Sequence, residues 1–201
     1  MITNLIAPPK AVLDEFRALL IAARESGDTE PTAMTVATVG ADGAISARTV
    51  LLKDVDARGF IFYTNFNSNK GRDLQENPRA ACLFLWKTLR LQVQAKIEGL
   101  VETVSANEAD DYFASRPRES QIGAWASKQS ESLDSREILM QRIAEFDAKF
   151  DGIAVPRPPH WSGFRVLPNM IEFWFGAPFR LHERVRYELI DGEWQSRALF
   201  P

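Results

Sequence analysis

The segment "MTVATVGADGAISARTVLLKDV", residues 34–55, contains two β-rich runs separated by a turn signal. Val, Thr and Ile are frequent in both runs, and Ala41-Asp42-Gly43 between them is typical of a turn. The segment therefore predicts a β-hairpin. Further runs with strand character are "FIFYTN" (60–65), "RAACLFLWK" (79–87), "LRLQVQAKIEGLVETV" (89–104), "GFRVLP" (163–168), "MIEFWF" (170–175), "FRLHERVRYELI" (179–190) and "EWQSRAL" (193–199).

Helical patterns flank and interrupt these runs. Residues 8–26 have apolar side chains at helical spacing, with Pro9 at the start and Gly27 as a stop signal, and a short helical stretch ends at Asn77-Pro78. Ser105 and Glu108 have the spacing of a capping box and predict a helix through Ala114.

A second capping-box spacing predicts a longer helix in the same region. Asp134 and Glu137 would start it, it would run through Phe150, and its apolar stripe would consist of Ile138, Leu139, Ile143 and Phe146. Strands before and after a helical insert indicate a mainly β fold with flanking helices (α+β), a small antiparallel barrel. We expect a single domain over 1–201, with an N-terminal helix within 1–30 and a helical insert at 105–150.

Composition narrows the class of protein. The net charge of −3 argues against nucleic-acid binding, which favours a basic face. No apolar run approaches ~18 residues and the start has no signal-peptide pattern, so we expect a cytoplasmic protein without membrane contact. The one cysteine, Cys82, lies among apolar residues and is expected in the core, and no Cys/His cluster predicts a metal site.

Two segments carry cations that could bind an anion. In "RTVLLK" (48–53), Arg48 and Lys53 have opposite strand parity, which predicts two separate sites or two solvated ends. In "YTNFNSNKGRD" (63–73), Lys70 lies in a polar loop before a helix start, where backbone N–H groups and hydroxyls could bind a phosphate. The alternative for this second segment is a plain polar loop in which Ser68 caps the helix.

Tyr112, Arg116 and Ser120 are spaced four residues apart. Pro117 disfavours helical geometry at Arg116, so we expect a helix end and a turn that present the three side chains together. A phenol, a guanidinium and a hydroxyl suit a phosphate monoester, because Arg offers a bidentate fork and the hydroxyls offer directed donors. Surface chemistry around a helix break is the alternative.

The C-terminal part holds one further candidate cluster. If "RLHER" (180–184) is extended, Arg180, His182 and Arg184 point to one face, and Trp174 precedes them. Gln129 and Ser130 are polar residues that follow an apolar stretch. None of these sets has the pattern of a Ser-His-Asp triad or a paired-carboxylate hydrolase, and the recurring chemistry is anion binding.

The segments "RTVLLK", "FYTN", "SRPRESQIGAWASKQS", "GFRV", "IEFW" and "RLHER", in this order, resemble the pyridoxamine 5′-phosphate oxidase family, flavin enzymes that make pyridoxal 5′-phosphate. The resemblance runs from about Pro31 to the C-terminus. It implies an FMN-binding split β-barrel with Greek-key antiparallel strands. It also implies a homodimer with FMN at the subunit interface.

The resemblance also implies roles for individual residues. Flavin contacts would come from Arg48, Thr49, Val50, Leu51, Leu52, Lys53, Tyr63, Thr64, Lys70, Gln129, Ser130, Trp174, Arg184 and either Gln92 or Gln94, which share strand parity. The substrate phosphate would be bound by Lys53, Tyr112, Arg116 and Ser120. Arg180 and His182 would be the catalytic pair that closes over the pyridine ring and also binds substrate.

The implied reaction is oxidation of pyridoxamine or pyridoxine 5′-phosphate to pyridoxal 5′-phosphate, with dioxygen as acceptor and hydrogen peroxide as product. A related FMN oxidase or reductase with another substrate, and a non-catalytic FMN or pyridoxal-phosphate binding protein, are the alternatives. The chain departs from the family at Asn69, where an Arg is common, and we expect FMN binding weaker by ~1 to 3 kcal/mol. Pro178 stiffens the loop before Arg180, and residues 1–12 lack the Arg and Tyr of some members' substrate cover.

Overall fold

The computed structural model describes residues 6–201 and consists of strands with flanking helices. The strands are β1 (Ala33–Val39), β2 (Ile45–Leu51), β3 (Asp54–Val55), β4 (Phe60–Asn65), β5 (Arg79–Trp86), β6 (Val93–Thr103), β7 (Trp161–Phe175), β8 (Glu183–Ile190) and β9 (Glu193–Leu199). The helices are α1 (Lys10–Glu25), α2 (Asn69–Glu76), α3 (Ala106–Ala114), α4 (Arg118–Ala126), α5 (Arg136–Lys149) and the short 3-10 helix η1 (Pro178–Arg180). The predicted mainly β fold is confirmed.

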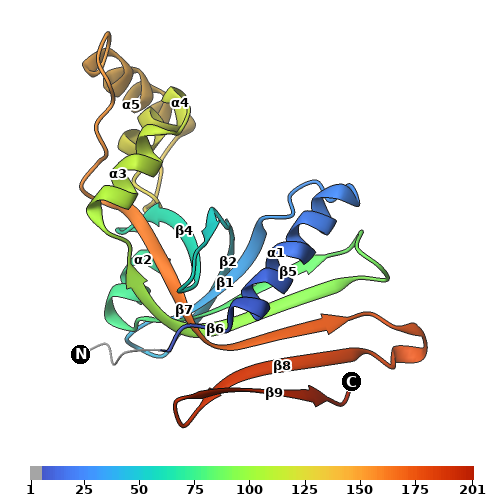
Figure 1. Cartoon of the computed structure of the whole chain (residues 1–201). Coiled ribbons are helices and arrows are strands. Elements are labelled where there is room, and N and C mark those ends of the chain that lie inside the picture. Colours follow the sequence, from blue (N-terminus) through green and yellow to red (C-terminus); the bar gives the residue numbers. More distant parts are fainter. Residues whose placement is uncertain (1–5) are drawn as a thin grey trace.

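One antiparallel sheet has the strand order β2-β1-β5-β6-β7-β4-β3 and curls into a half-barrel (Figure 1). Strand β7 is its spine, because it pairs with β6 on one side and with β4 and then β8 on the other. Strands β5, β6 and β7 lie side by side in chain order, and β7 also lies beside β4, which precedes them in the sequence. This is a Greek-key order. The strand β9 extends the sheet beyond β8.

The hairpin predicted from residues 34–55 is confirmed. Strands β1 and β2 pair in register from Ala33 with Leu51 to Val39 with Ile45. A second hairpin turn joins β8 to β9, where Asp191 and Gly192 have φ of 51° and 85°. Two positive φ angles match a two-residue turn whose twist suits an antiparallel hairpin.

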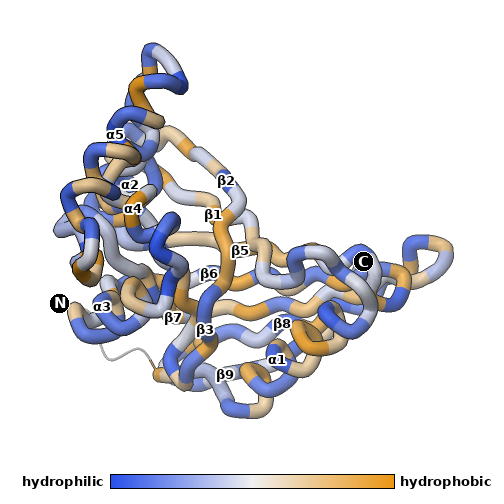
Figure 2. The backbone as a smooth tube through the Cα atoms, turned by 90° about the horizontal axis from the view of Figure 1, so that it is seen from above, coloured by the Kyte–Doolittle hydropathy of each residue, from blue (hydrophilic) through white to orange (hydrophobic). Residues whose placement is uncertain are grey.

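The main core lies between α1 and the sheet, where the predicted N-terminal helix is found. Phe16 of α1 is fully buried, and its ring centroid lies 4.8 Å from that of Phe60 and 5.0 Å from that of Phe84. Burying a side chain of this size contributes ~1.5 to 3 kcal/mol. Apolar positions are prominent along β1 and β7 (Figure 2). Cys82 is buried in this core as predicted, and burial raises its pKa to about 12.

Helices α3 to α5 form a lobe at one end of the sheet (Figure 1). A second apolar cluster of Phe113, Ile122, Phe150, Val155 and Trp161 forms the centre of this lobe. The capping box predicted for α3 is confirmed, since Ser105 Oγ accepts from Glu108 N at 3.2 Å and Glu108 Oε2 accepts from Ser105 N at 2.9 Å.

Two helix predictions in the lobe were wrong or incomplete. The N-cap of α5 is Ser135 rather than Asp134, and its side chain forms no capping hydrogen bond. The spacing of Asp134 and Glu137 alone does not decide which residue is the N-cap. The predicted stripe is not buried as a unit, since Ile138 is 42% exposed whereas Ile143 and Phe146 pack against the apolar cluster of the lobe. Helix α4 was not predicted, although Pro117 at its N-cap and Glu119 in its first turn are start signals.

Three strand predictions also need correction. The runs "GFRVLP" and "MIEFWF" are one strand, β7, because β6 accommodates Pro168 by a register shift between Glu98 and Gly99. Strand β8 begins only at Glu183, since Phe179 and Arg180 have φ of 58° and 63° and break the extended backbone. Arg180, His182 and Arg184 therefore do not share a strand face.

Strand boundaries overturn two parity arguments. Strand β2 ends at Leu51, so Lys53 lies in a connection and its direction is not set by the alternation that governs Arg48. Strand β6 begins at Val93, so Gln92 precedes the strand that holds Gln94. In both pairs one residue lies outside regular structure, where period 2 does not apply.

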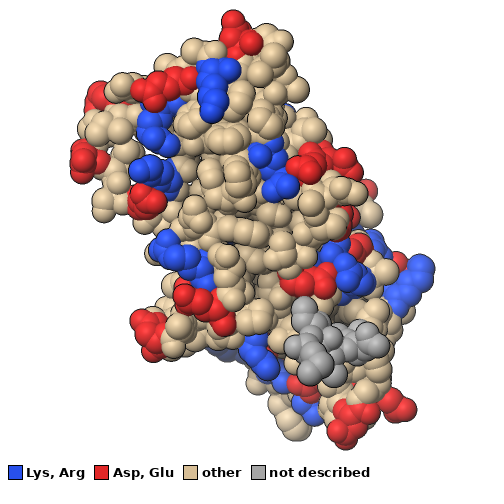
Figure 3. Space-filling view, turned by 90° about the vertical axis from the view of Figure 1, so that its left-hand side faces the viewer, with Lys and Arg blue, Asp and Glu red and all other residues tan. Residues whose placement is uncertain are grey.

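The surface in Figure 3 carries Lys and Arg interspersed with Asp and Glu. Within residues 6–201, no helix is long and apolar enough to cross a membrane.

Candidate active site

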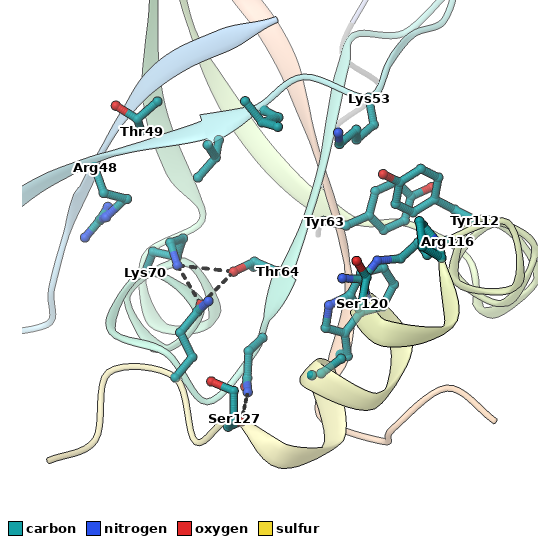
Figure 4. A pocket seen from close by; sticks show the side chains of 18 residues that line it. Arg48, Thr49, Lys53, Tyr63, Thr64, Lys70, Tyr112, Arg116, Ser120 and Ser127 are labelled. Carbon is teal, nitrogen blue, oxygen red and sulfur yellow. Dashed lines mark hydrogen bonds between the residues drawn. The ribbon is translucent and has the colours of Figure 1, made fainter. Parts of the chain in front are cut away.

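A cavity of about 820 Å³ opens where β2, β4 and α2 meet the helical lobe (Figure 4). This volume is in the range of small-molecule sites. The predicted ligand-binding residues that line it are Arg48, Thr49, Val50, Leu51, Lys53, Tyr63, Thr64, Lys70, Tyr112, Arg116, Ser120 and Gln129. Arg48 and Lys53 both line this one cavity but lie at different sides of it (Figure 4), and their service to two separate ligands stays a prediction.

Lys70 lies on one side of the cavity in the first turn of α2. Its Nζ donates to Gln129 Oε1 at 2.8 Å, Thr64 Oγ1 at 3.2 Å and Ser68 Oγ at 3.3 Å, and these partners are neutral. Within residues 6–201 no carboxylate forms an ion pair with it. Burial and the nearby Arg48 charge lower the pKa of Lys70 to about 8. This end of the cavity therefore favours an anionic group.

The two readings of the polar loop around Lys70 are compatible. Ser68 is the N-cap of α2, and its Oγ accepts from Gly71 N at 3.2 Å. The same turn directs Lys70 into the cavity. Arg48 is different, because Asp73 lies 3.7 Å from its guanidinium and Thr38 Oγ1 accepts from it at 2.6 Å. Much of the charge of Arg48 is thus already balanced.

Tyr112, Arg116 and Ser120 lie on the other side of the cavity (Figure 4). Pro117 ends one helix and begins the next, so the end of α3 and the start of α4 present the three side chains together, as the helix break predicted. In residues 6–201 no ion pair involves Arg116, and its buried Nη1 has no hydrogen-bond partner. Burial lowers the pKa of Arg116 below its usual value.

An aromatic stack forms the wall beside Arg116. The Tyr63 ring lies 4.0 Å from that of Tyr112 with an interplanar angle of 14°, and 5.4 Å from that of Trp161 with an angle of 8°. Gly163 pairs with Tyr63 across β4 and β7, and a Cβ atom there would lie 2.8 Å from the Tyr63 ring. Only glycine leaves room for the ring in this position.

The surroundings of Tyr63 keep its phenol neutral. Tyr63 donates its hydroxyl to the backbone oxygen of Glu108 at 3.4 Å. Burial, followed by the charge of Glu108, raises the pKa of Tyr63 to about 12. The phenol is therefore a neutral hydrogen-bond donor over the ordinary pH range.

Six residues of the cavity wall were not predicted from the sequence. They are Asn65, Pro117, Gly123, Ala124, Ser127 and Trp161. Gly123 and Ala124 lie on α4, which was not predicted, and their side chains have no distinctive chemistry. Trp161 carried a signal that could have been used, since it is a large aromatic residue directly before "SGFRV".

The other predicted site residues do not line the cavity. Leu52 is buried in the main core, and Ser130 lines a separate hollow beside α5. Gln92 lies before β6, where its backbone oxygen accepts from Gly176 N at 2.8 Å. The remaining five, Gln94, Trp174, Arg180, His182 and Arg184, belong to the β6–β7–β8 part of the sheet.

These five residues are called the second group below. Gln94, Trp174 and Arg184 are cross-strand partners on three neighbouring strands, so their side chains point to one face. The ring of His182 lies 4.4 Å from that of Trp174, and its Nδ1 accepts from Ala177 N at 3.2 Å. That bond leaves Nε2 as the donor of the neutral ring.

Arg184 already has an acidic partner in the chain. Its guanidinium lies 2.7 Å from Glu172 Oε1, and Arg186 lies 2.7 Å from Glu172 Oε2. Burial opposes ionisation of Glu172, but hydrogen bonds from Arg186 and Arg184 prevail and its pKa is lowered. Arg186 also lies 3.4 Å from Glu188 Oε1, so both arginines have carboxylate partners within the sheet.

Two family models match the chain. The model described as "Pyridoxamine 5'-phosphate oxidase" matches residues 14–150, and "Pyridoxine 5'-phosphate oxidase C-terminal dimerisation region" matches residues 161–201. The chain belongs to the pyridoxamine 5′-phosphate oxidase family. The resemblance found in the sequence motifs is thereby confirmed.

Full-length relatives of this oxidase family are closely similar. The pyridoxine/pyridoxamine 5'-phosphate oxidase of Xanthomonas euvesicatoria pv. vesicatoria is 58% identical over 191 residues, covering 94% of this chain and 96% of the relative. The protein of the same name from Caulobacter vibrioides is 53% identical over 199 residues, covering 96% and 89%. These matches span both the cavity and the second group.

Solved structures of this family agree with the fold. PhzG from Burkholderia lata 383, solved in complex with tetrahydrophenazine-1-carboxylic acid, has a TM-score of 0.87 and 35% identity over 98% of this chain and 95% of its own. A pyridoxamine 5'-phosphate oxidase-related, FMN binding protein from Nostoc punctiforme has a TM-score of 0.75 at 16% identity, covering 98% and 99%. The second match supports the fold alone.

No group of three or more His, Cys, Asp or Glu side chains arranged to hold a metal ion occurs in the part of the chain that the structure describes.

Proposed function

We propose that this chain is an FMN-dependent oxidase that converts pyridoxamine 5′-phosphate or pyridoxine 5′-phosphate to pyridoxal 5′-phosphate, with dioxygen as acceptor and hydrogen peroxide as product. The observation that carries the proposal is a pair of cations at separate sides of one cavity, Lys70 and Arg116, neither of which has an acidic partner among residues 6–201 (Figure 4). A cavity with two such cations suits two phosphates, one on the cofactor and one on the substrate. The relatives' name, pyridoxine/pyridoxamine 5'-phosphate oxidase, supports the proposed substrate, and the motif resemblance implies FMN as the cofactor.

The residues around Lys70 fit an FMN phosphate. A buried ammonium held only by neutral oxygens, with a hydroxyl from Thr64, offers charge and directed donors to a phosphate. Arg48 adds a second cation on the same side, and Thr49, Val50 and Leu51 provide an extended wall on β2. When bound there, FMN supplies the two-electron acceptor for the substrate and the route of the electrons to dioxygen.

Arg116 is the centre of the proposed substrate-phosphate site. Its Nη1 is desolvated and has no partner within residues 6–201, so a phosphate oxygen would satisfy it. Tyr112 and Ser120 add hydroxyl donors from either side, and Lys53 lies near Tyr63 on the same wall. Holding the phosphate here fixes the position of the pyridine ring, which is a proximity effect.

The second group requires another copy of the chain in this proposal. Gln94, Trp174, Arg180, His182 and Arg184 lie outside the cavity wall of their own chain, and a dimerisation-region model covers the last four. We infer a homodimer in which this group of one copy faces the cavity of the other, with FMN at the interface. Gln94 rather than Gln92 then contacts the flavin, because it lies in register with Trp174.

A related FMN oxidase with another substrate is the second candidate. The similarity to PhzG, which was solved with tetrahydrophenazine-1-carboxylic acid, a ligand without a phosphate, favours it. Within the cavity the desolvated Arg116 beside two hydroxyls suits the phosphate better, since a phosphate can accept from all three. A non-catalytic binding protein remains the third reading.

One experiment separates the oxidase proposal from the other two readings. The purified chain is saturated with FMN, its visible spectrum is recorded, and pyridoxine 5′-phosphate or pyridoxamine 5′-phosphate is added in air. We expect bound flavin, pyridoxal 5′-phosphate and equimolar hydrogen peroxide. Bound flavin without product contradicts the oxidase proposal, and turnover of pyridoxine lacking the phosphate at the same efficiency contradicts the role of Arg116.

A further inference from the structure

Trp161, the first residue of β7, contacts Arg116 and the aromatic rings beside it. The Arg116 guanidinium carbon lies 4.7 Å from the centre of the Trp161 ring, and the Tyr112 ring lies 6.2 Å from it with an interplanar angle of 6°. The indole is nearly buried and borders the cavity. It thus touches both the cation and the aromatic stack, and it lies closer to the guanidinium than Phe113 does, at 4.7 Å against 5.5 Å.

We propose that Trp161 is the positioning residue of the anion site, holding Arg116 with its donors free for the substrate's phosphate. This inference rests on the proposed function. An arginine can be held by a carboxylate or by an aromatic face. A carboxylate would accept from the guanidinium N–H groups and neutralise the charge. The face of an indole attracts the cation but leaves the N–H groups, which lie in the guanidinium plane, open to an anion.

Comparison with other arginines of the chain supports this division. Arg165 and Arg184 are held by carboxylates, at 2.9 Å from Glu102 and 2.7 Å from Glu172. Arg116 has no such partner in residues 6–201 and instead lies over Trp161 and, at 5.5 Å, Phe113. The aromatic platform replaces the acid at the site where the guanidinium must bind an external anion.

The platform itself is held firmly. The backbone of Trp161 donates to Pro158 O at 3.0 Å and accepts from Arg157 Nη1 at 2.8 Å. Phe113 contacts the indole edge-on, with ring centroids 5.1 Å apart. Because packing fixes the ring before ligand binds, little conformational entropy is lost when Arg116 engages a phosphate.

The test is a double-mutant cycle on FMN-saturated protein with Trp161→Leu, Arg116→Ala and the double variant. Calorimetric binding of inorganic phosphate and steady-state kinetics with pyridoxamine 5′-phosphate are both measured. In the wild-type background we expect Trp161→Leu to weaken phosphate binding and raise KM about tenfold, with kcat changed less than about twofold. In the Arg116→Ala background the same substitution should change neither value by more than about twofold.

Equal weakening by Trp161→Leu in both backgrounds overturns the proposal, because Trp161 would then act independently of Arg116. Trp161→Phe is the second variant, since it keeps most of the packing in case the leucine variant does not fold. We expect it to raise KM about threefold, because phenylalanine binds a cation more weakly than tryptophan. The proposal is contradicted if Trp161→Phe leaves KM unchanged and the effects of Trp161→Leu and Arg116→Ala on phosphate binding simply add in the double variant.

The failure of the proposed function gives a different result. If wild-type protein turns over no pyridoxamine 5′-phosphate yet binds inorganic phosphate with coupling between Trp161 and Arg116, the oxidase proposal fails and the anion platform stands. If wild-type protein turns over the substrate without that coupling, the oxidase stands and the platform is wrong.

Discussion

At the scale of single residues, the cations of this chain differ mainly in what holds them. Arg165 is 2% exposed and lies 2.8 Å from Asp56 Oδ2 and 2.9 Å from Glu102 Oε1, so its charge is balanced by carboxylates of the fold. Lys70 and Arg116 are also desolvated but contact hydroxyls, an amide and aromatic rings. Burying a cation without an acid is unfavourable, and a bound anion would remove that cost.

Lys70 makes the affinity for FMN depend on pH. Its pKa of about 8 lies below the ordinary lysine value of 10.5, so the free protein loses this charge as pH rises through 8. Anion binding needs the charged form, and we expect affinity to fall about tenfold per pH unit above 8. Flavin fluorescence titrations between pH 7 and 9.5 measure this decline.

Lys70→Met is the control for the pH dependence. It should bind FMN about 10- to 100-fold more weakly at pH 7, since a charge-assisted contact is lost, and show no decline above pH 8. The wild-type and variant curves then converge at high pH. A wild-type affinity that stays constant to pH 9.5 contradicts the assignment of Lys70 to the phosphate.

Arg116→Ala and Arg184→Ala test the assignment of the two phosphates and the flavin. Arg116→Ala should raise KM for pyridoxamine 5′-phosphate at least tenfold and leave bound FMN unchanged, whereas Arg184→Ala should lower FMN content with a smaller effect on KM. Flavin absorbance per protein and steady-state kinetics give both values. Loss of FMN in Arg116→Ala would show that this arginine serves the cofactor.

At the scale of elements, an ion-pair network ties the lobe to the sheet. Glu108 completes the capping box of α3 and also forms an ion pair with Arg165 of β7. Arg58 adds a second cation 2.7 Å from Glu102. Because Tyr112 lies one turn further along α3, the network sets where its phenol meets Tyr63.

Glu108→Gln should destabilise the protein by ~1 to 2 kcal/mol at pH 7, because both the cap and the ion pair are weakened. Hydrogen bonds from the Ser105 backbone and hydroxyl, followed by Arg165, lower the pKa of Glu108 from 4.5 to about 2. Its stabilisation is therefore complete above pH 4.5 and is lost as pH falls toward 2. The difference in unfolding free energy between wild type and variant should shrink over that range.

Asp111→Asn is the matched control for this prediction. Asp111 is an exposed carboxylate on the same helix, and its side chain makes no hydrogen bond to residues 6–201. We expect its replacement to change stability by less than about 0.5 kcal/mol at any pH. Equal effects of the two substitutions in urea denaturation would show that the network contributes nothing specific.

At the scale of the whole molecule, the proposed site is divided between two regions of the sheet. The cavity is built from β2, β4, α2 and the lobe, while Trp174, His182 and Arg184 lie on β7, β8 and the turn between them. The proposed homodimer would join the two regions across its interface. The single-domain organisation of the chain stays a prediction.

Mixing two impaired variants tests this arrangement directly. Arg116→Ala damages the cavity and Arg180→Ala damages the turn, and each alone should have low activity at a substrate concentration below the wild-type KM. If sites are shared, unfolding and refolding an equal mixture gives half heterodimers, each with one intact site, and about a quarter of wild-type activity returns. Refolding each variant separately is the control. No recovery in a mixture that contains heterodimers, verified with a tagged copy, contradicts a shared site.

Much of the fold could be read from local patterns. The hairpin of residues 33–51, the helix α1 and the capping box of α3 follow from alternation, helical spacing and side-chain caps, all of which act over a few residues. The continuity of β7 could not, because Pro168 is ordinarily a boundary signal, whereas helix α4 begins at Pro117 and was missed although this start signal is local. Whether a proline ends an element or is accommodated depends on its neighbours across the sheet or lobe.

For the site, the sequence by itself determined the chemistry: which residues can bind phosphates, and through its motifs which family they belong to. The tertiary structure alone decided which of these residues meet. It placed Arg48 and Lys53 in one cavity, set Arg180 apart from Arg184 by a left-handed turn, and put Trp161 under Arg116. The physical reason is that strand parity and helical spacing fix directions within one element, whereas contacts between elements depend on where each element ends and what packs against it.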